Sequence, residues 1–180
     1  RPWPVKSIDT LISSAATGAR ACFIELTAPQ KWRHIHDMPD KNEKKLALGW
    51  REWVRLPELG LDSIKAKVDT GARTSALHAF EVNPFVEKGK RRVEFKMHPN
   101  QRDQDTVIVC MADIKDQRIV RDSGGHQQER WVIETPICIG NQCWPIEVTL
   151  TSRDDMLFRM LLGRTAMRRR AMVDPSRSYL

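Results

Sequence analysis

Residues 67 to 77 read KVDTGARTSAL, and this stretch decides how the rest of the chain is interpreted. Directly before it, from position 64 to position 68, apolar side chains alternate with lysines, which predicts a strand with one buried face. Asp69 then lies where that strand ends, and Gly71 allows the backbone a positive φ or a close approach to a neighbour. Asp, Thr and Gly are also ordinary turn residues, so the stretch alone fits either a simple turn or a catalytic loop.

The composition is that of a globular chain with one main domain. Its 180 residues are 41% hydrophobic and 29% charged. No apolar run approaches the roughly 18 residues that a membrane-spanning helix needs, so no membrane contact is expected. The net charge is +7, but basic and acidic residues are interleaved, which disfavours nucleic acid as a partner. The densest basic run, Arg168 to Arg170, is interpreted as the solvated face of a helix.

The cysteines and the N-terminal segment indicate a cytoplasmic protein. Four cysteines are too few and too scattered for a disulfide framework. Cys138 and Cys143 would face each other across a hairpin, where we expect two packed thiols, with a disulfide as the alternative. The apolar stretch 11–26 resembles a secretory segment, but Arg20 and Glu25 interrupt it, so no signal peptide is expected.

The chain divides near position 45. Residues 1–45 contain prolines and the run DKNEKK, which predicts a linker or a poorly ordered extension with a short helix around 8–26. Residues 46–180 show short segments of period two, which predict an all-β domain, closed or sandwiched. The expected strands are 64–68, 93–97, 107–114, 131–139 and 144–150, with a hairpin turn at Gly140-Asn141 and a helix at 165–171. Tryptophans at the expected strand positions 50, 53, 131 and 144 are interpreted as core or interface residues.

A second segment makes the opening stretch more specific. Downstream, the apolar run MLFRMLL ends in Gly163-Arg164. Asp69-Thr70-Gly71-Ala72 after an apolar strand, together with Leu161-Leu162-Gly163-Arg164, resembles the signature of retropepsin-like aspartic proteases. The resemblance implies a closed retropepsin-like barrel with one short C-terminal helix.

Residues 46–180 also resemble one bacterial family in particular. The segments LGWREWVRLPELGL, SGG..ER and VDPSRSYL carry this resemblance, beside the two segments already quoted. The family is known as ATP-dependent zinc protease and is often encoded beside an ATP-grasp ligase that adds glutamates to a ribosomal protein. The resemblance therefore implies a peptide or protein substrate, which a glutamate-rich peptide would suit, and an ATP-grasp ligase as a partner.

Both cofactors in that family name lack a sequence signature here. No phosphate-binding loop of the form G-x-x-x-x-G-K-[ST] is present. The five histidines, at 34, 36, 78, 98 and 126, do not have the spacing of a hydrolytic zinc site. We expect catalysis without metal or nucleotide.

Aspartic protease chemistry needs two carboxylates around one water, one ionised as general base and the other protonated as general acid. The chain supplies one Asp-Thr-Gly in the right context, so the second Asp69 is expected from another copy on a twofold axis. The resemblance implies that Thr70 braces the two loops and that Gly71 lets them approach. Asp122-Ser123-Gly124 is a competitor within the chain, but it follows Arg121 and not an apolar pair.

Residues flanking the two segments are candidates for substrate binding. Ala72, Arg73, His78 and Arg164 either make ordinary structural contacts or meet the substrate, where the basic ones would bind a carboxylate. Two other classes of function stay open: a non-catalytic binding module for acidic peptides or a partner ligase, and a basic RNA-associated accessory protein.

Overall fold

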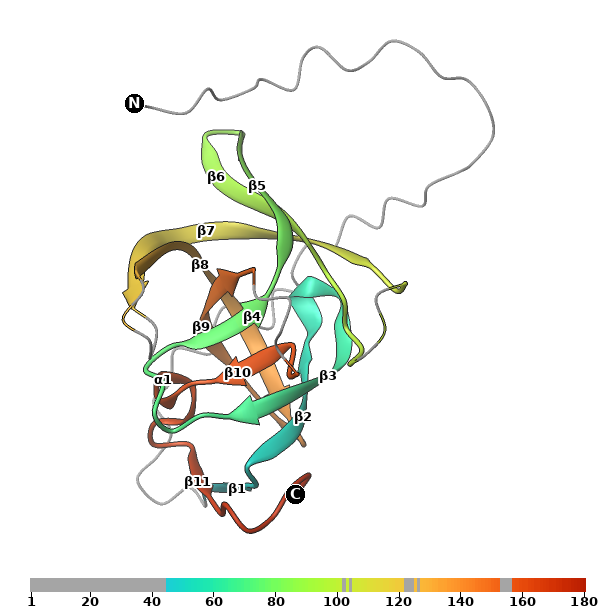
Figure 1. The fold of residues 1–180 in the computed structure, drawn as a ribbon, viewed down its shortest axis with the longest axis vertical. Helices are drawn as coiled ribbons and strands as arrows, with labels where there is room; N and C mark the ends of the chain where they lie inside the picture. The colour runs from blue at the N-terminus through green and yellow to red at the C-terminus, as the bar shows by residue number, and fades with distance from the viewer. Residues whose placement is uncertain (1–44, 102, 104, 122–124, 126, 153–156) are drawn as a thin grey trace.

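The computed structural model describes residues 45–101, 103, 105–121, 125, 127–152 and 157–180. These residues form strands almost throughout, with one short α-helix and one 3₁₀ turn (Figure 1). The elements are β1 (Leu46–Leu48), β2 (Arg51–Leu56), η3 (Pro57–Leu59), β3 (Leu61–Val68), β4 (Ser75–His78), β5 (Phe80–Glu87), β6 (Lys90–Met97), β7 (Ile108–Arg121), β8 (Gln127–Ile139), β9 (Gln142–Thr151), β10 (Met160–Leu162), α1 (Arg164–Met167) and β11 (Ala171–Val173). The prediction of an all-β fold with one short C-terminal helix is confirmed.

Nine strands form one sheet, in the order β2-β3-β10-β4-β9-β8-β7-β6-β5. A further pairing of β2 with β8, between Arg55 and Cys138, closes the six strands from β2 to β8 into a ring. Beyond that ring, β7 continues the sheet to the β5–β6 hairpin, which projects at the top of Figure 1. β1 and β11 pair in parallel as a separate small sheet.

The hydrophobic core joins buried residues of the ring with buried residues of β6 and β7, and it follows the alternation of the strands. In β3, Ile64, Ala66 and Val68 are buried, as the period-two pattern predicts, while Lys67 is exposed. The same alternation buries Met160 and Leu162 in β10 and leaves Leu161 half-buried. In β3 and β10 the side chains of one face are therefore buried in the core, whereas the alternate residues Lys67 and Leu161 are exposed and half-buried.

The strand β10 lies between β3 and β4, the two strands that flank the Asp69 loop. It runs parallel to β3, with Leu162 opposite Val68, and antiparallel to β4, with Leu161 opposite Ala76. This crossing brings residues 160–165 against residues 69–75, although about ninety positions separate them in the sequence shown. The residues that contact the Asp69 loop therefore come from a distant part of the sequence, through the pairing of β10 with β3 and β4.

The predicted strands are all observed, at greater length. The predicted segments 93–97, 107–114, 131–139 and 144–150 lie mainly within β6, β7, β8 and β9, and Gly140-Asn141 forms the expected hairpin turn with Gly140 at φ 56°. The predicted helix 165–171 is wrong beyond Met167, because the chain turns at 168–170 and pairs β11 with β1. Arg168 to Arg170 therefore belong to a turn and not to a helix face.

Two side-chain predictions need correction. The structure joins Cys138 and Cys143 in a disulfide across the β8–β9 hairpin, so the interpretation as packed thiols is wrong and its alternative holds. Trp144 is buried, as the core interpretation predicts; Trp50 and Trp53 are 36% and 48% exposed, so for them the core is wrong and the interface alternative stays a prediction. Both sit on or beside β2, near the surface that the last residues of the chain cover.

Residues 174–180 lie along the start of β2 and the residues directly before it. Trp50 N–H donates to the Arg177 carbonyl, and Tyr179 N–H donates to the Arg51 carbonyl. Glu52 is 2% exposed, and its carboxylate accepts hydrogen bonds from the N–H groups of Gly49 and Leu180. Trp50 in turn accepts a hydrogen bond from Val68 N–H, so this packing supports the end of β3 directly before Asp69.

Three sequence interpretations lie outside the described residues: the helix around 8–26, the histidines at 34 and 36, and the competing Asp122-Ser123-Gly124. The domain boundary near position 45 stays a prediction.

Candidate active site

Asp69 begins the loop between β3 and β4. Its N–H donates to the Leu162 carbonyl at 2.9 Å, which ties the loop to β10. Its Oδ1 accepts hydrogen bonds from Gly71 N–H at 2.9 Å and Ala72 N–H at 3.0 Å. In the described part of the chain Oδ2 makes no hydrogen bond, and the residue is half-buried. The loop thus fixes one oxygen of the carboxylate and leaves the other available to a water or a substrate.

The close turn behind this carboxylate explains Gly71. A Cβ placed on Gly71 would lie 3.2 Å from Asp69 Oδ1, tighter than most contacts of this kind. Thr70 is exposed at the tip of the loop, where its hydroxyl can meet another molecule.

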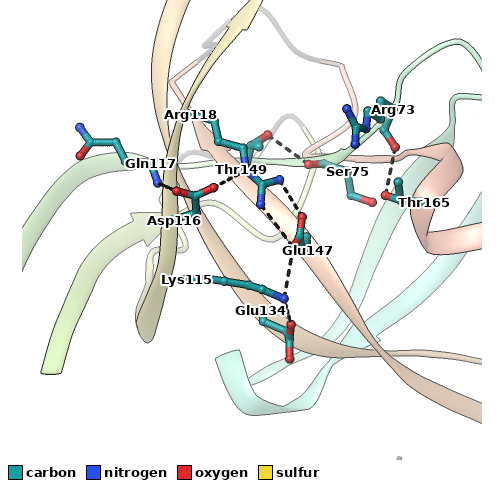
Figure 2. Close-up of polar contacts among 10 residues, drawn as sticks. All are labelled: Arg73, Ser75, Lys115, Asp116, Gln117, Arg118, Glu134, Glu147, Thr149 and Thr165. Carbon is teal, nitrogen blue, oxygen red and sulfur yellow. Dashed lines mark hydrogen bonds and ion pairs between the residues drawn. The ribbon is translucent and has the colours of Figure 1, made fainter. Parts of the chain in front are cut away.

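The Leu-Leu-Gly-Arg segment holds the other side of the loop. Arg164 N–H donates to the Ala72 carbonyl at 2.9 Å. Thr165 donates to the Arg73 carbonyl twice, from its N–H and from its hydroxyl, each at 3.0 Å (Figure 2). The two segments singled out in the sequence therefore form one structural unit.

Gly163 is required for this contact. A Cβ at Gly163 would lie 2.5 Å from the Thr74 carbonyl carbon and 2.7 Å from its oxygen, both backbone atoms. Gly163 N–H donates to the buried hydroxyl of Ser75 at 3.1 Å. The backbones of β4 and the β10–α1 junction therefore pass each other too closely for any side chain at position 163.

Ser75 and Thr149 belong to this support, although the sequence did not identify them. The Thr149 hydroxyl donates to the Ser75 carbonyl at 3.1 Å (Figure 2), and both side chains are buried. The period-two pattern places Thr149 on a strand, but its partner on β4 follows only from the parallel pairing of β4 with β9. No local signal reveals such a pairing.

The structure separates the predicted substrate-binding residues into two groups. Ala72, Arg73 and Arg164 lie on the loop or directly against it, and both arginine side chains are exposed. His78 is 1% exposed, at the other end of β4, and its N–H donates to the Arg159 carbonyl. The structure does not bring His78 to the Asp69 loop.

The described residues of one copy place one carboxylate, that of Asp69, at this loop. Among the described residues, no hydrogen bond or ion pair joins Asp69 to another acidic or basic side chain. Nor do these residues contain a group of three or more His, Cys, Asp or Glu side chains placed to hold a metal ion. The chemistry available to a single copy is that of one oriented, half-buried carboxylate.

The all-β fold, with β10 paired to both strands that flank the Asp-Thr-Gly loop, agrees with a retropepsin-like protein. A family model described as retropepsin-like aspartic endopeptidase RimB matches residues 47–180, and the chain belongs to this RimB-like family.

Curated relatives of the chain carry a different name. A "Probable alpha-L-glutamate ligase" of Shewanella pealeana is 42% identical over 138 residues, which are 77% of this chain and 30% of the relative. The protein of the same name from Parasynechococcus marenigrum is 47% identical over 136 residues, 76% of this chain and 29% of its own length. The chain thus spans under a third of the curated relatives it matches.

A solved structure shares the fold. The crystal structure of a Legionella pneumophila protein of unknown function has a TM-score of 0.64 to this chain and 25% sequence identity. The match covers 76% of this chain and 98% of that protein. As to membranes, no helix in the described ranges is long and apolar enough to cross one.

Proposed function

We propose that the chain is an aspartic-type peptidase whose active site forms between two copies, each contributing Asp69. The observation that carries the proposal is the Asp69 carboxylate, with Oδ1 held by two backbone N–H groups and Oδ2 without a hydrogen bond from the residues that the structure describes. Membership of a retropepsin-like family supports the same chemistry.

The reaction is hydrolysis of a peptide bond by water held between the two carboxyl groups. The ionised Asp69 takes a proton from the water while the water oxygen attacks the carbonyl carbon of the peptide bond. The protonated Asp69 of the other copy gives its proton to the carbonyl oxygen. Collapse of the tetrahedral intermediate breaks the C–N bond while a carboxyl group protonates the departing nitrogen. Two carboxyl groups this close cannot both ionise, so they titrate as a pair.

Residues around the loop take supporting roles in this proposal. The exposed Thr70 hydroxyl lies where it can hydrogen-bond to the partner copy, and Gly71 keeps the loop narrow enough for two loops to meet. Arg73 and Arg164 are exposed beside the loop, where they can contact an acidic peptide.

A second candidate is a binding module without catalysis. The names of the relatives favour it, because each is described as a glutamate ligase and the chain matches under a third of its length. In this alternative the loop would bind a glutamate-bearing chain or a ligase, and the two copies of Asp69 would never meet.

The Asp69→Asn variant separates the two candidates. We expect it to lower the rate of peptide cleavage by at least about 100-fold, because both carboxyl groups of the proposed pair become amides and neither can transfer protons. Asp62→Asn is the matched control, since Asp62 is exposed on the same strand, and it should leave the rate unchanged. Full activity in Asp69→Asn, with both variants folded by circular dichroism, would sink the catalytic proposal.

A further inference from the structure

Strands β2 and β3 share an outer face, on the side away from the core, which we call the β2–β3 face. Alternation along the two strands places five side chains on it: Arg51, Trp53 and Arg55 from β2, and Lys65 and Lys67 from β3. In the strand pairing Arg51 lies opposite Lys67, and Trp53 lies opposite Lys65. The face therefore surrounds a tryptophan with four cations.

These four cations have no carboxylate partner among the described residues, where no ion pair includes any of them. Of the two acidic residues on these strands, Glu52 is 2% exposed on the core side, and Asp62 lies at the start of β3, far from Lys67. Arg51 and Lys67 lie directly opposite each other, and like charges in that arrangement repel. Along the sequence the charges are interleaved, but the fold collects these four, so the face attracts a polyanion.

Aromatic rings lie among the cations. Residues 177–180 run beside β2 (Figure 1) and bring Tyr179 onto Trp53, with 5.9 Å between the ring centroids and 30° between the planes. The Lys65 ammonium lies 4.8 Å from the centre of the Trp53 ring, and the Arg51 guanidinium lies 4.9 Å from that of Tyr179. Trp53 and Tyr179 are still 48% and 36% exposed. Ring surface is therefore open to solvent between positive charges.

We infer that the β2–β3 face binds single-stranded nucleic acid. The cations would contact successive phosphates, and bases would stack on the open ring surface of Trp53 and Tyr179. Single strands are bound in this way with little sequence preference, because every nucleotide has a phosphate and every base has an aromatic face. The inference goes beyond the proposed function, since it does not depend on whether Asp69 is catalytic.

Two other polyanions fit this face less well. An acidic peptide would satisfy the cations, but glutamate and aspartate have no ring to stack on Trp53. Binding to an anionic membrane buries apolar side chains in the lipid. Trp53 lies in the middle of a strand with the Lys65 ammonium against its ring, so it cannot enter lipid without taking that charge along. Cations and rings on one face therefore favour nucleic acid.

The test measures binding of three fluorescein-labelled strands of equal length and charge to the full chain: oligouridine RNA, oligothymidine DNA and a strand without bases. Fluorescence anisotropy at low salt should show RNA or DNA binding at least about tenfold more tightly than the abasic strand, because only strands with bases can stack. Whichever binds more tightly identifies the nucleic acid. Trp53→Ala should remove most of this preference, and Trp53→Phe should retain most of it. Met111→Ala, which shortens another exposed side chain of the sheet, is the control and should leave the preference unchanged.

The salt dependence of the affinity counts the phosphate contacts. If all four cations contact phosphates, the affinity for the preferred strand should fall about 50-fold between about 50 mM and about 200 mM salt. Lys65→Gln and Arg55→Gln each remove one contact and should reduce this fall to about 20-fold. Lys90→Gln and Arg91→Gln are the matched controls, because both residues are exposed on β6, away from this face. They should leave the fall at about 50-fold.

Several results would overturn the inference. Equal binding of the three strands, or a folded Trp53→Ala protein that keeps the preference for bases, would leave only charge attraction. A salt dependence unchanged in Lys65→Gln and Arg55→Gln would place the contacts elsewhere, even if Trp53→Ala does not fold. No binding at low salt would also contradict it.

Two further probes separate the rival partners and the proposed function. Hexaglutamate, or vesicles of phosphatidylserine and phosphatidylcholine, would replace nucleic acid as the partner if either bound as tightly as the strands and depended equally on Trp53. Asp69→Asn should bind nucleic acid like the unaltered protein. Loss of peptide cleavage in Asp69→Asn and loss of strand binding in Trp53→Ala are therefore separate results, and neither proposal fails with the other.

Discussion

Asp69 owes its orientation to backbone groups, and the side chain of Ser75 holds some of those groups in place. The Ser75 hydroxyl accepts the Gly163 N–H, and Gly163 leads into the two residues that bind the Ala72 and Arg73 carbonyls. The carboxylate therefore depends on a buried hydroxyl six positions away along the chain. Removing that one hydroxyl group tests the dependence.

Replacing Ser75 with alanine should destabilise the protein by about 1–3 kcal/mol, because the buried Gly163 N–H loses its acceptor. Thr165→Ala is the matched control: it also removes a hydroxyl, but the Arg73 carbonyl keeps the hydrogen bond from Thr165 N–H. The control should cost under about 0.5 kcal/mol, as is usual for exposed sites. Urea unfolding of the three proteins measures both values, and equal losses would contradict this role of Ser75.

The two segments that form the loop and its support could be predicted from local sequence, whereas the residues that depend on distant pairing could not. Asp69, Gly71 and Gly163 are marked by short patterns. Ser75 carries no such pattern, since it becomes important only through the hydrogen bond that it accepts from the Gly163 N–H. His78 was chosen for its nearness in sequence to Asp69, but strand β4 carries it away from the loop.

At the scale of elements, the position of β10 between β3 and β4 decides the geometry of the site. The crossing is possible because Gly163 permits backbone contact with Thr74 and Ser75. A side chain there would push β10 away from β4, and the Asp69 N–H to Leu162 carbonyl hydrogen bond would move with it.

Gly163→Ala should therefore cost about 1–3 kcal/mol in unfolding free energy, which is typical of an overpacked site. It should also lower peptide cleavage more than its loss of stability explains at temperatures where the variant stays folded. Gly89→Asn serves as control, since a Cβ at Gly89 meets nothing within 4 Å and Asn tolerates a φ of 77°. Thermal unfolding with a parallel cleavage assay checks both effects; a Gly163→Ala protein as stable and active as the control would contradict the close-contact interpretation.

The strands β7, β8 and β9 carry a separate network of charges on their outer face (Figure 2). Arg118 binds Glu147 at 2.7 Å and also Asp116, while Lys115 binds Glu134 and Glu147. The hydrogen bond from Arg118 is the largest influence on Glu147 and, with help from Lys115, lowers its pKa against the opposing effect of burial. This network stabilises strand pairing and lies apart from the proposed chemistry.

The lowered pKa of Glu147 gives the network a defined pH dependence. Its stabilisation is present above the pKa of the unfolded state, about 4.3, and is lost as the pH falls through the lower pKa of the folded state. Glu147→Gln should therefore reduce the unfolding free energy by up to about 1 kcal/mol at pH 7, because the pair is partly exposed. Urea unfolding should show this difference narrowing in acid below about pH 4; a constant difference from pH 7 to pH 3 would contradict the assignment.

The sequence predicted whether a segment is a strand or a helix better than it predicted where that segment begins and ends. Period-two alternation identified the long strands, because each has one buried and one exposed face. The predicted helix after Gly163 was too long, because the parallel pairing of β11 with β1 follows it. That pairing joins segments far apart in the sequence, so no local pattern predicts it. The disulfide between Cys138 and Cys143 was expected only as an alternative, because a hairpin that places two thiols opposite each other does not determine whether they are oxidised.

For the whole molecule, the important quantity is the number of carboxylates at the site. One chain supplies a single Asp69 loop, while the proposed hydrolysis needs two. Thr70 is exposed, and among the residues that the structure describes none donates a hydrogen bond to Oδ2, so the proposed second copy could approach the loop here. Names of relatives do not decide between catalysis and binding, because the chain matches under a third of their length.

The most direct test mixes the chain bearing Asp69 with Asp69→Asn in measured ratios, by co-refolding so that copies exchange, and follows peptide cleavage. If each active site needs Asp69 from two copies, activity per total protein falls as the square of the fraction of chains that bear Asp69. At one such chain in ten it should reach about one hundredth of the starting value. A decrease in direct proportion to that fraction, to about one tenth, would show that each chain works alone and would contradict the paired Asp69 site.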